Sequence, residues 1–398
     1  MRLCFYNPQA VSDLLGKTCF SLISQVAAGK MAKHQEKLGF FLDVVRDKKY
    51  DTAIVVDGTA SSFPFHRFPV LNHYAVIRLF SFFEVYIWCF LNGINPFKQT
   101  IIFSLTGLDP KNDVLFGFAY FTRTFFDEAM TERSFFKGFT GKKMVHVSHF
   151  YGNTKWVADN IKRTGTKMVV AEADLKKSDY FNKYFGFIDF VVILPFVLRK
   201  RYVDMVDFSQ RKNKCLALGT LEIFPDDHRH TEDHFEHFKI DVLHPMRKAI
   251  YENRVRVRHV IDSLIMNKEH QSFLSRTFRH NGKKYHSFDI VEKFNEYKMF
   301  VSPEENIGLP SVNCIEGMAC GCAYFGLDSP IYTDWGFKKG IHYVIYDGTL
   351  EGLVDKIEYF QQHPDELQTI AVAGQAFVVE HFQESRIVED FFKKIEAS

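Results

Sequence analysis

Three acids, a Gly-Leu-Pro turn and small polar residues are gathered in one short stretch, EENIGLPSVNCIEGMACG, which runs from Glu304 to Gly321. Gly308 and the proline two positions later predict a turn that leads from an apolar strand into a helix. The residues at the expected helix start are Ser311, Val312 and Asn313. Unpaired amide N–H groups and the positive end of the helix dipole favour an anion at such a start, and a diphosphate would suit it.

The acids occupy different positions in this stretch. Glu316 lies in the first turns of the predicted helix, where its carboxylate can accept hydrogen bonds from the vicinal hydroxyls of a ribose. Glu304 and Glu305 lie between the strand and the turn and can reach the hydroxyls of a hexose. One segment would then contact a sugar, phosphates and a ribose in order. The simpler interpretation of Glu304 and Glu305 is that they are ordinary solvated carboxylates.

The elements around this stretch predict an α/β protein. Short apolar runs with the length of buried strands alternate with helical patterns, which is typical of a parallel, doubly wound sheet. A polar and basic stretch after Pro195 interrupts the alternation. We expect two Rossmann-like domains, residues 1–200 and 201–383, that face each other across a cleft. A last helix, from about residue 384 to 398, would pack back on the first domain.

Individual elements follow from the same patterns. The strands expected in the first half are Arg2–Tyr6, Thr52–Gly58, Asp113–Phe121, Lys143–Phe150, Lys167–Asp174 and Asp189–Phe196. Those expected in the second half are Lys214–Thr220, Met299–Pro303 and Cys322–Leu327. The expected helices include 153–165, which ends at Gly165, then 244–253, 287–298 with Ser287 as its N-cap, 350–364 and 366–382.

The stretch EYKMFVSPEENIGLPSVNCIEGMACGC resembles the donor-site signature of the retaining GT-B glycosyltransferases of the large group-1 family. That signature has a strand, an acid, a Gly-x-Pro turn and then a Glu-(Ala/Gly)-Met-Ala-Cys-Gly helix. The likeness covers residues 287–398 well and residues 212–286 weakly. Glu305 and Glu316 are eleven positions apart, farther than in the common pattern, so the resemblance leaves open which of Glu304 and Glu305 contacts the sugar.

The resemblance implies transfer of a glycosyl group from a nucleotide sugar to a hydroxyl of a glycan or glycolipid, of the lipopolysaccharide or capsule type, with retention of stereochemistry. Glu304 and Glu305 are then candidate catalytic residues. A third is His149, at a strand end where similar enzymes often carry a sugar-contacting histidine, although a structural histidine fits equally well. The resemblance also implies that no cofactor is needed beyond the nucleotide sugar, which is a co-substrate.

The same resemblance suggests how the leaving diphosphate is held. No metal is expected, because a helix N-terminus and basic side chains stabilise the charge in enzymes of this kind. The basic candidates are Arg247 and Lys248. Gly219 and Thr220 would form a loop close to the phosphates, although Gly219 is equally consistent with a plain turn.

Two other functions stay open at this point. A nucleotide-sugar 2-epimerase has the same two-domain fold and a similar donor pocket, and it would convert a nucleotide sugar without any acceptor. A non-catalytic paralogue would bind a glycan or a partner protein through the same cleft. Product analysis without acceptor distinguishes the first from a transferase.

Composition limits the partners and the compartment. The formal net charge of +2 and the scattered basic residues give no reason to expect nucleic acid as a partner. Seven cysteines in no framework spacing, with no secretory signal before them, indicate reduced thiols and a cytoplasmic protein, which could work at the inner face of the membrane.

Two segments allow more than one interpretation. The aromatic run from Ile77 to Leu91 fits a buried helix, or a helix in the membrane interface that would bring the protein to a lipid-linked acceptor. The segment from Asp226 to Phe238 holds four histidines among acids. It fits a solvated helix, a metal site built on His230 and His234, or a border of the predicted cleft.

Overall fold

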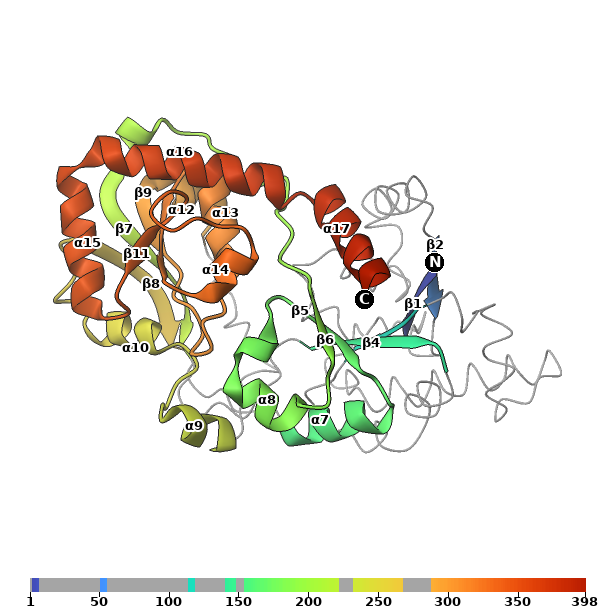
Figure 1. The fold of residues 1–398 in the computed structure, drawn as a ribbon. Helices are drawn as coiled ribbons and strands as arrows, with labels where there is room; N and C mark the ends of the chain where they lie inside the picture. Colours follow the sequence, from blue (N-terminus) through green and yellow to red (C-terminus); the bar gives the residue numbers. More distant parts are fainter. Residues whose placement is uncertain are drawn as a thin grey trace, which may run out of the picture. The chain divides into compact units, whose positions relative to one another are not determined.

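The computed structural model describes residues 2–6, 51–55, 114–118, 140–147, 154–221, 232–267 and 288–398. The chain divides into two units, one of residues 1–194 with 384–398 and the other of residues 195–383 (Figure 1). The division falls between Leu194 and Pro195, a few residues before the 200–201 boundary expected from the sequence. His149 and the aromatic run Ile77–Leu91 lie outside the described residues, so those predictions stay untested.

The first unit contains a parallel sheet in the order β2-β1-β3-β4-β5-β6. Its strands are β1 (Arg2–Tyr6), β2 (Asp51–Val55), β3 (Val114–Phe118), β4 (Lys142–His146), β5 (Met168–Ala171) and β6 (Phe190–Ile193). Its described helices are α7 (Thr154–Arg163), the short 3-10 turn η4 (Leu175–Lys177), α8 (Asp179–Phe185) and α17 (Glu384–Ala397). The last of these is tied to the sheet, because Lys394 Nζ donates to the carbonyl of Ile193 at 3.2 Å.

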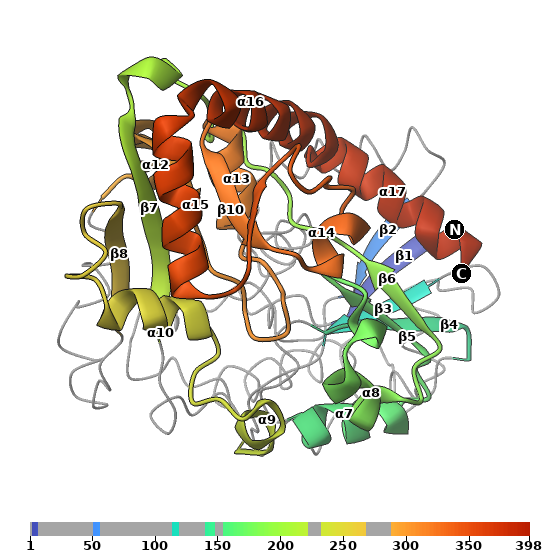
Figure 2. The ribbon, with the colours of Figure 1, turned by 60° about the vertical axis from the view of Figure 1, so that its left-hand side comes forward.

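The second unit contains a parallel sheet in the order β11-β10-β9-β7-β8. Its strands are β7 (Lys212–Leu221), β8 (Ile261–Asn267), β9 (Tyr297–Val301), β10 (Ala323–Leu327) and β11 (Val344–Tyr346). The described helices are α9 (Glu232–Phe238), α10 (Pro245–Glu252), α12 (Ile290–Glu296), α13 (Asn313–Ala319), α14 (Pro330–Asp334), α15 (Leu350–Gln362) and α16 (Pro364–His381), with the 3-10 turn η5 (Phe208–Gln210) before β7. Figures 1 and 2 show α15 and α16 as long helices beside this sheet.

The predicted strands are found at their expected places, since runs of β-branched and aromatic residues form the interior of both sheets. The late helices also follow their pattern: α15 buries Leu350, Leu353, Ile357 and Phe360, which repeat with helical spacing. Among the described residues, no helix is both long and apolar enough to cross a bilayer. The cysteines at 215, 314, 320 and 322 are free and buried.

Several expectations were wrong in detail. Neither β8 nor β11 was among the strands predicted from the sequence. β7 continues to Leu221, so Gly219 and Thr220 lie inside the strand and do not form a loop after it. The N-cap of α12 is Asp289, whose carboxylate accepts from the amide of Val291, and not Ser287.

Glycine allows α13, the helix of the donor-site stretch, to pack closely on the sheet. A Cβ at Gly317 would lie 2.5 Å from Cζ of Phe300 on β9, so only glycine allows α13 to approach so closely. Gly321, just after α13, has φ of +80°. A Cβ there would lie 2.6 Å from Oδ2 of Asp204.

We expect Gly321→Ala to destabilise the protein through both its left-handed backbone and this collision. Gly340 is a matched control, because it has φ of +70° and nothing within 4 Å of an added Cβ. Gly340→Ala should cost about 1 kcal/mol for the backbone alone. Gly321→Ala should cost at least about 1 kcal/mol more, measured by urea unfolding. Equal costs for the two variants would show that Asp204 moves aside freely.

Candidate functional site

Several of the predicted donor-binding residues of the second unit lie near the carboxyl edge of its sheet. β7 ends at Leu221 and β9 at Val301, and both strands are parallel neighbours, so the segments after them leave from one edge. Ligands of open α/β sheets bind at this edge. The segment from Ser302 to Val312 lies there between β9 and α13.

The start of α10 packs on the segment that carries the first two acids. His244 Nδ1 lies 3.2 Å from the carbonyl of Glu304, and the amide of Asn306 donates to the carbonyl of Leu243 at 2.8 Å. His234 of α9 is fully buried, with Nε2 at 3.3 Å from Oδ1 of Asn306. His234, which belongs to the histidine-rich segment, therefore lies beside the Glu304–Asn306 segment.

His244 and Asn306 were not among the residues nominated from the sequence. The available signal was weak: His244 directly precedes Pro245 at the first turn of α10, and Asn306 follows the two acids. No group of three or more potential metal ligands occurs among the residues that the structure describes. The side chains of His230 and Asp233 are outside that part.

Arg247 packs on the end of β7. Its Nη1 donates to the carbonyl of Thr220 at 3.1 Å, and the side chain is only 6% exposed. Gly219, with φ of +144°, makes room for it, because a Cβ there would lie 2.5 Å from Nε of Arg247. The structure therefore brings Gly219, Thr220 and Arg247 together.

Lys248 has a different environment from its neighbour. Its ammonium pairs with Asp241 and lies 4.0 Å from Glu252. The hydrogen bond to Asp241 raises the pKa of Lys248 above its ordinary value. Its positive charge is thus shared with two acids, and none of its described contacts joins it to the donor-site stretch.

Glu304 is turned into the core. Its side chain is buried, and its Oε1 accepts hydrogen bonds from the hydroxyl of Tyr332, from the amide of Leu327 at 2.9 Å and from the hydroxyl of Tyr324 at 3.3 Å. Its Oε2 is buried, with no hydrogen-bond partner in the part of the chain that the structure describes. Burial raises the pKa of the Glu304 carboxyl, although the hydrogen bonds from Tyr332 and Leu327 oppose the rise. Neither a solvated acid nor an accessible carboxylate describes this residue.

Glu305 forms the turn that follows. Its amide donates to the carbonyl of Leu309 at 2.9 Å, and its carbonyl accepts from the amide of Gly308 at 2.7 Å. Gly308 has φ of +78°, as the predicted turn requires, and its carbonyl accepts from Ser329 Oγ at 3.3 Å. Glu305 is 7% exposed and is buried like Glu304.

The start of α13 differs from the expectation of open amide donors. The helix begins at Asn313, with Val312 at the N-cap position and no side-chain cap on that residue. Ser311 accepts hydrogen bonds from the first amides instead. Its Oγ accepts from the amide of Asn313 at 3.2 Å, and its carbonyl accepts from the amide of Cys314 at 3.0 Å. The amide of Glu316 donates to Val312. The amides of Asn313 and Cys314 are therefore engaged within the chain, whereas the amide of Glu316 makes the first regular helical hydrogen bond.

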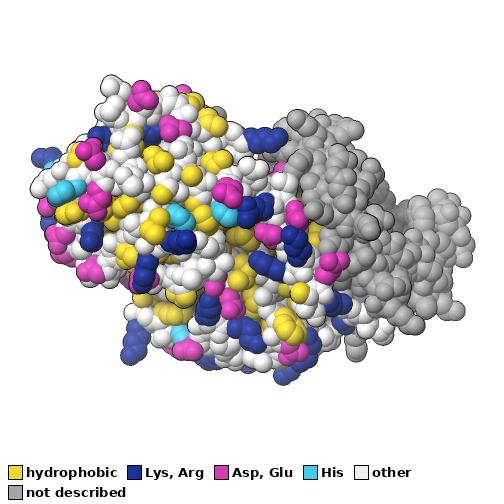
Figure 3. Space-filling model, turned by 45° about the horizontal axis from the view of Figure 1, so that its top comes forward, with side chains coloured by type: hydrophobic (Ala, Val, Ile, Leu, Met, Phe, Trp, Pro, Cys, Tyr) yellow, Lys and Arg dark blue, Asp and Glu magenta, His cyan; other side chains and the backbone are white. Residues whose placement is uncertain are grey.

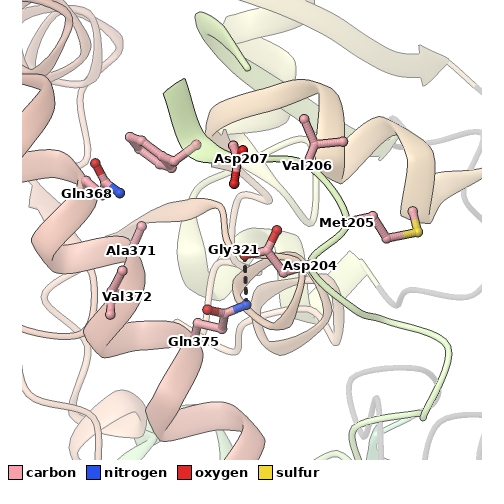
Figure 4. Close-up of a pocket in the computed structure, with 10 residues that line it drawn as sticks. Asp204, Met205, Val206, Asp207, Gly321, Gln368, Ala371, Val372 and Gln375 are labelled. Atoms are coloured by element: carbon pink, nitrogen blue, oxygen red, sulfur yellow. Dashed lines mark hydrogen bonds between the residues drawn. The ribbon is translucent and has the colours of Figure 1, made fainter. Parts of the chain in front are cut away.

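A separate hollow of about 500 Å³ lies at the opposite edge of the same sheet. Figure 4 shows Asp204, Asp207 and Met205 of the segment before β7 across from residues of α16, with Gln375 Nε2 at 3.2 Å from Asp204 Oδ2. Gly321, just before β10, also lines it. Because strands enter the sheet at this edge, the hollow meets the donor-site stretch only at its last residue, Gly321. On the face drawn in Figure 3, acidic and basic side chains are interspersed over the described residues.

Comparison with known proteins identifies the second unit. Residues 214–393 match the family model described as "Glycosyl transferase-like". This region of the chain is a glycosyltransferase domain. The match confirms the predicted resemblance to glycosyltransferases for this region, and it includes each donor-binding candidate from Gly219 to Glu316.

Several solved structures are similar to this chain. Sucrose-phosphate synthase from Thermosynechococcus elongatus matches 100% of this chain and 98% of its own, with 10% identity and a TM-score of 0.51. HepE of Anabaena, solved with UDP, matches 100% of both chains with 10% identity and a TM-score of 0.49. A glycosyltransferase from Rickettsia africae matches 100% of this chain and 97% of its own, with 13% identity and a TM-score of 0.46. No curated protein matches. The α/β GT-B fold predicted for this glycosyltransferase is confirmed by the first of these.

The environment of Glu304 predicts a pH-dependent stability. Its pKa is raised on folding, so the folded chain binds the proton more tightly. The stability that the neutral carboxyl contributes is complete below the unfolded pKa and is lost as pH rises through the folded pKa. We expect the free energy of unfolding of Glu304→Gln to increase relative to that of the wild type as pH rises from about 5 to 8. The increase should be at most about 1.4 kcal/mol per pH unit.

Denaturant unfolding at each pH measures this difference. Glu351→Gln is the control, because Glu351 is an exposed carboxylate whose hydrogen bond with Arg256 lowers its pKa. Its difference from the wild type should stay constant over this range. A constant difference for Glu304→Gln as well would mean that Glu304 is ionised in the folded protein.

Proposed function

We propose that the chain transfers a sugar from a nucleotide-sugar donor to a hydroxyl of a glycan or glycolipid acceptor. The observation that carries the proposal is the gathering of Arg247, Gly219 and the Glu304–Asn306 segment at one edge of the sheet, inside the family-matched region. A guanidinium and acids at a carboxyl edge suit a phosphorylated sugar.

Each residue has a role in this proposal. Arg247 meets the diphosphate beside the end of β7, where a guanidinium can stabilise the charge that develops on a leaving group. Glu316 accepts hydrogen bonds from the ribose hydroxyls. Glu305 contacts the hexose, because the Oε1 of Glu304 is already engaged by Tyr332, Tyr324 and Leu327. Glu304 supports the turn from inside the core.

Further details of the proposal come from the family resemblance. The sugar is transferred with retention, by attack from the leaving-group face, and the diphosphate leaves without a metal ion. His149 contacts the sugar from the first unit. The acceptor is a lipopolysaccharide or capsule glycan on the cytoplasmic side of the membrane, reached through the aromatic run Ile77–Leu91.

Nucleotide binding is the first test. We expect one nucleoside diphosphate among UDP, GDP, ADP, CDP and TDP to stabilise the full chain, by about 2.7 kcal/mol at 100 times its dissociation constant. Glu316→Ala should reduce the affinity about tenfold or more, because hydrogen bonds to a charged group are lost. Thermal shift and calorimetry measure both effects. Normal affinity in Glu316→Ala would remove the ribose assignment. Conversion of a nucleotide sugar without acceptor would favour the epimerase, and no binding in the panel would favour the paralogue.

Neighbouring basic residues give a second test. Arg247→Gln should lower the affinity for the diphosphate about tenfold, whereas Lys248→Gln should change it less than about threefold, because Lys248 pairs with Asp241 instead. Both variants are compared with the wild type by calorimetry after their melting temperatures are measured. Equal losses would show that both side chains meet the diphosphate.

A further inference from the structure

Asn306 lies in the turn that follows the two acids, and its backbone is held on both sides. Its amide donates to the carbonyl of Leu243, just before α10, at 2.8 Å. It is also the second residue of a turn in which the amide of Gly308 donates to the carbonyl of Glu305 at 2.7 Å. The place of Asn306 at the carboxyl edge of the sheet is therefore fixed before any ligand contributes.

His234 fixes one end of the Asn306 side chain. Its Nε2 lies 3.3 Å from Oδ1 of Asn306, and its imidazole is fully buried. An amide oxygen only accepts, so Nε2 carries the hydrogen in this contact. The imidazole ring lies 5.6 Å from the ring of Phe235 and 5.0 Å from that of Phe238, centroid to centroid. The aromatic contacts and the hydrogen bond together turn the oxygen end of the amide toward α9.

The other end of the Asn306 side chain is a buried donor. Its Nδ2 has no hydrogen-bond partner in the part of the chain that the structure describes. A buried NH2 group without an acceptor costs free energy. In Asn253, by contrast, Nδ2 donates to the carbonyl of Ala249 at 2.9 Å and Oδ1 accepts from Arg256 at 3.1 Å. Because Asn306 as a whole is only half-buried, a ligand at this edge can supply the missing acceptor.

The neighbours of Asn306 indicate which kind of acceptor this is. Arg247, the candidate for the diphosphate, follows Leu243 by four positions, about one helical turn. Glu305 directly precedes Asn306, and an acid disfavours a phosphate oxygen beside it. A sugar hydroxyl suits both residues, because its oxygen accepts from the amide and its hydrogen can go to a carboxylate. The neighbours thus favour a hydroxyl of the transferred sugar over a phosphate.

We propose that Asn306 is a specificity-determining residue, whose Nδ2 donates to one hydroxyl of the transferred sugar, and that His234 is a positioning residue that holds the amide in this orientation. This inference rests on the proposed function, in which Glu305 contacts the same sugar. Asn306 touches the sugar, whereas His234 acts only through Asn306. A sugar without a hydroxyl at that place leaves the amide unpaired and binds less tightly.

The test measures binding to the full chain by calorimetry. The probes are UDP-glucose, UDP-galactose, UDP-N-acetylglucosamine, ADP-glucose and GDP-mannose, each with its own nucleoside diphosphate. For the donor that binds most tightly, the ratio of its affinity to that of its diphosphate isolates the contribution of the sugar. Asn306→Ala should lower this ratio about fivefold, because one hydrogen bond is lost, and should change the affinity for the diphosphate less than about twofold.

Deoxy analogues of that donor identify the hydroxyl. In the wild type, the analogue without the hydroxyl that Asn306 contacts should bind about fivefold more weakly than the intact sugar. Asn306→Ala should bind this analogue and the intact sugar equally well, because the contact is already missing.

Three more variants separate the donor role from the contact with His234. Asn306→Asp keeps an acceptor for His234 but has no donor, so it should lower the ratio at least as much as Asn306→Ala. His234→Leu should lower the ratio about threefold, because the amide is then free to turn. His234→Gln should keep it, since a glutamine Nε2 can donate in the place of the imidazole. Melting temperatures confirm that each variant is folded.

Asn253→Ala is the matched control. The amide of Asn253 is also half-buried, but both of its ends are used within the chain, at the end of α10. This variant should keep the wild-type ratio.

The outcomes separate this inference from the proposed function. A wild type that binds none of the nucleotide sugars overturns the proposed function, and this inference with it. A wild type that binds one, with an unchanged ratio in Asn306→Ala or Asn306→Asp, overturns the role of Asn306 alone. A loss in Asn306→Ala that is the same for donor and diphosphate marks a structural residue and overturns it too. An unchanged ratio in His234→Leu overturns the role of His234.

Discussion

The approach of α13 to β9 at Gly317 is the contact on which the rest of the second unit's site depends. A side chain at this position would collide with Phe300, and the helix would have to move away from the sheet. Such a shift would carry Glu316 with it, and it would change the turn at Gly308 that enters the helix. The acids are therefore placed by packing in the core before any ligand contributes.

The two buried acids Glu304 and Glu316 have different neighbours. Glu304 has a raised pKa and two tyrosine hydroxyls at one oxygen, which suits a neutral group inside the core. Glu316 is equally buried, on α13 directly before the glycine that packs on Phe300. Two acids of the same type, twelve positions apart in sequence, thus lie in different parts of the core.

Much of the fold could be predicted from local patterns. The interior strands are runs such as MVVA in β5, and the amphipathic helices repeat apolar residues at helical spacing. β8 was not recognised because Asp262 and Ser263 interrupt its apolar character. β11 was not recognised because three residues are too few to show a pattern. The motif alone indicated Glu316 and Gly308, and the family resemblance added Gly219. It could not show that Glu304 faces Tyr324 and Tyr332 or that Ser311 uses the first amides of α13, since these depend on contacts made in three dimensions.

The path of the chain between the units has a consequence for biosynthesis. Residues 195–383 form one unit, whereas α17 belongs with residues 1–194, so the second unit is an insertion into the first. On the ribosome, the second unit can be finished while the first still lacks its last helix. Until then β6 lacks the lysine of α17 that binds the carbonyl of Ile193. A fragment cut at the first boundary would share that gap, so the amino-terminal half is a poor candidate for expression by itself, whereas the inserted half has all of its own elements.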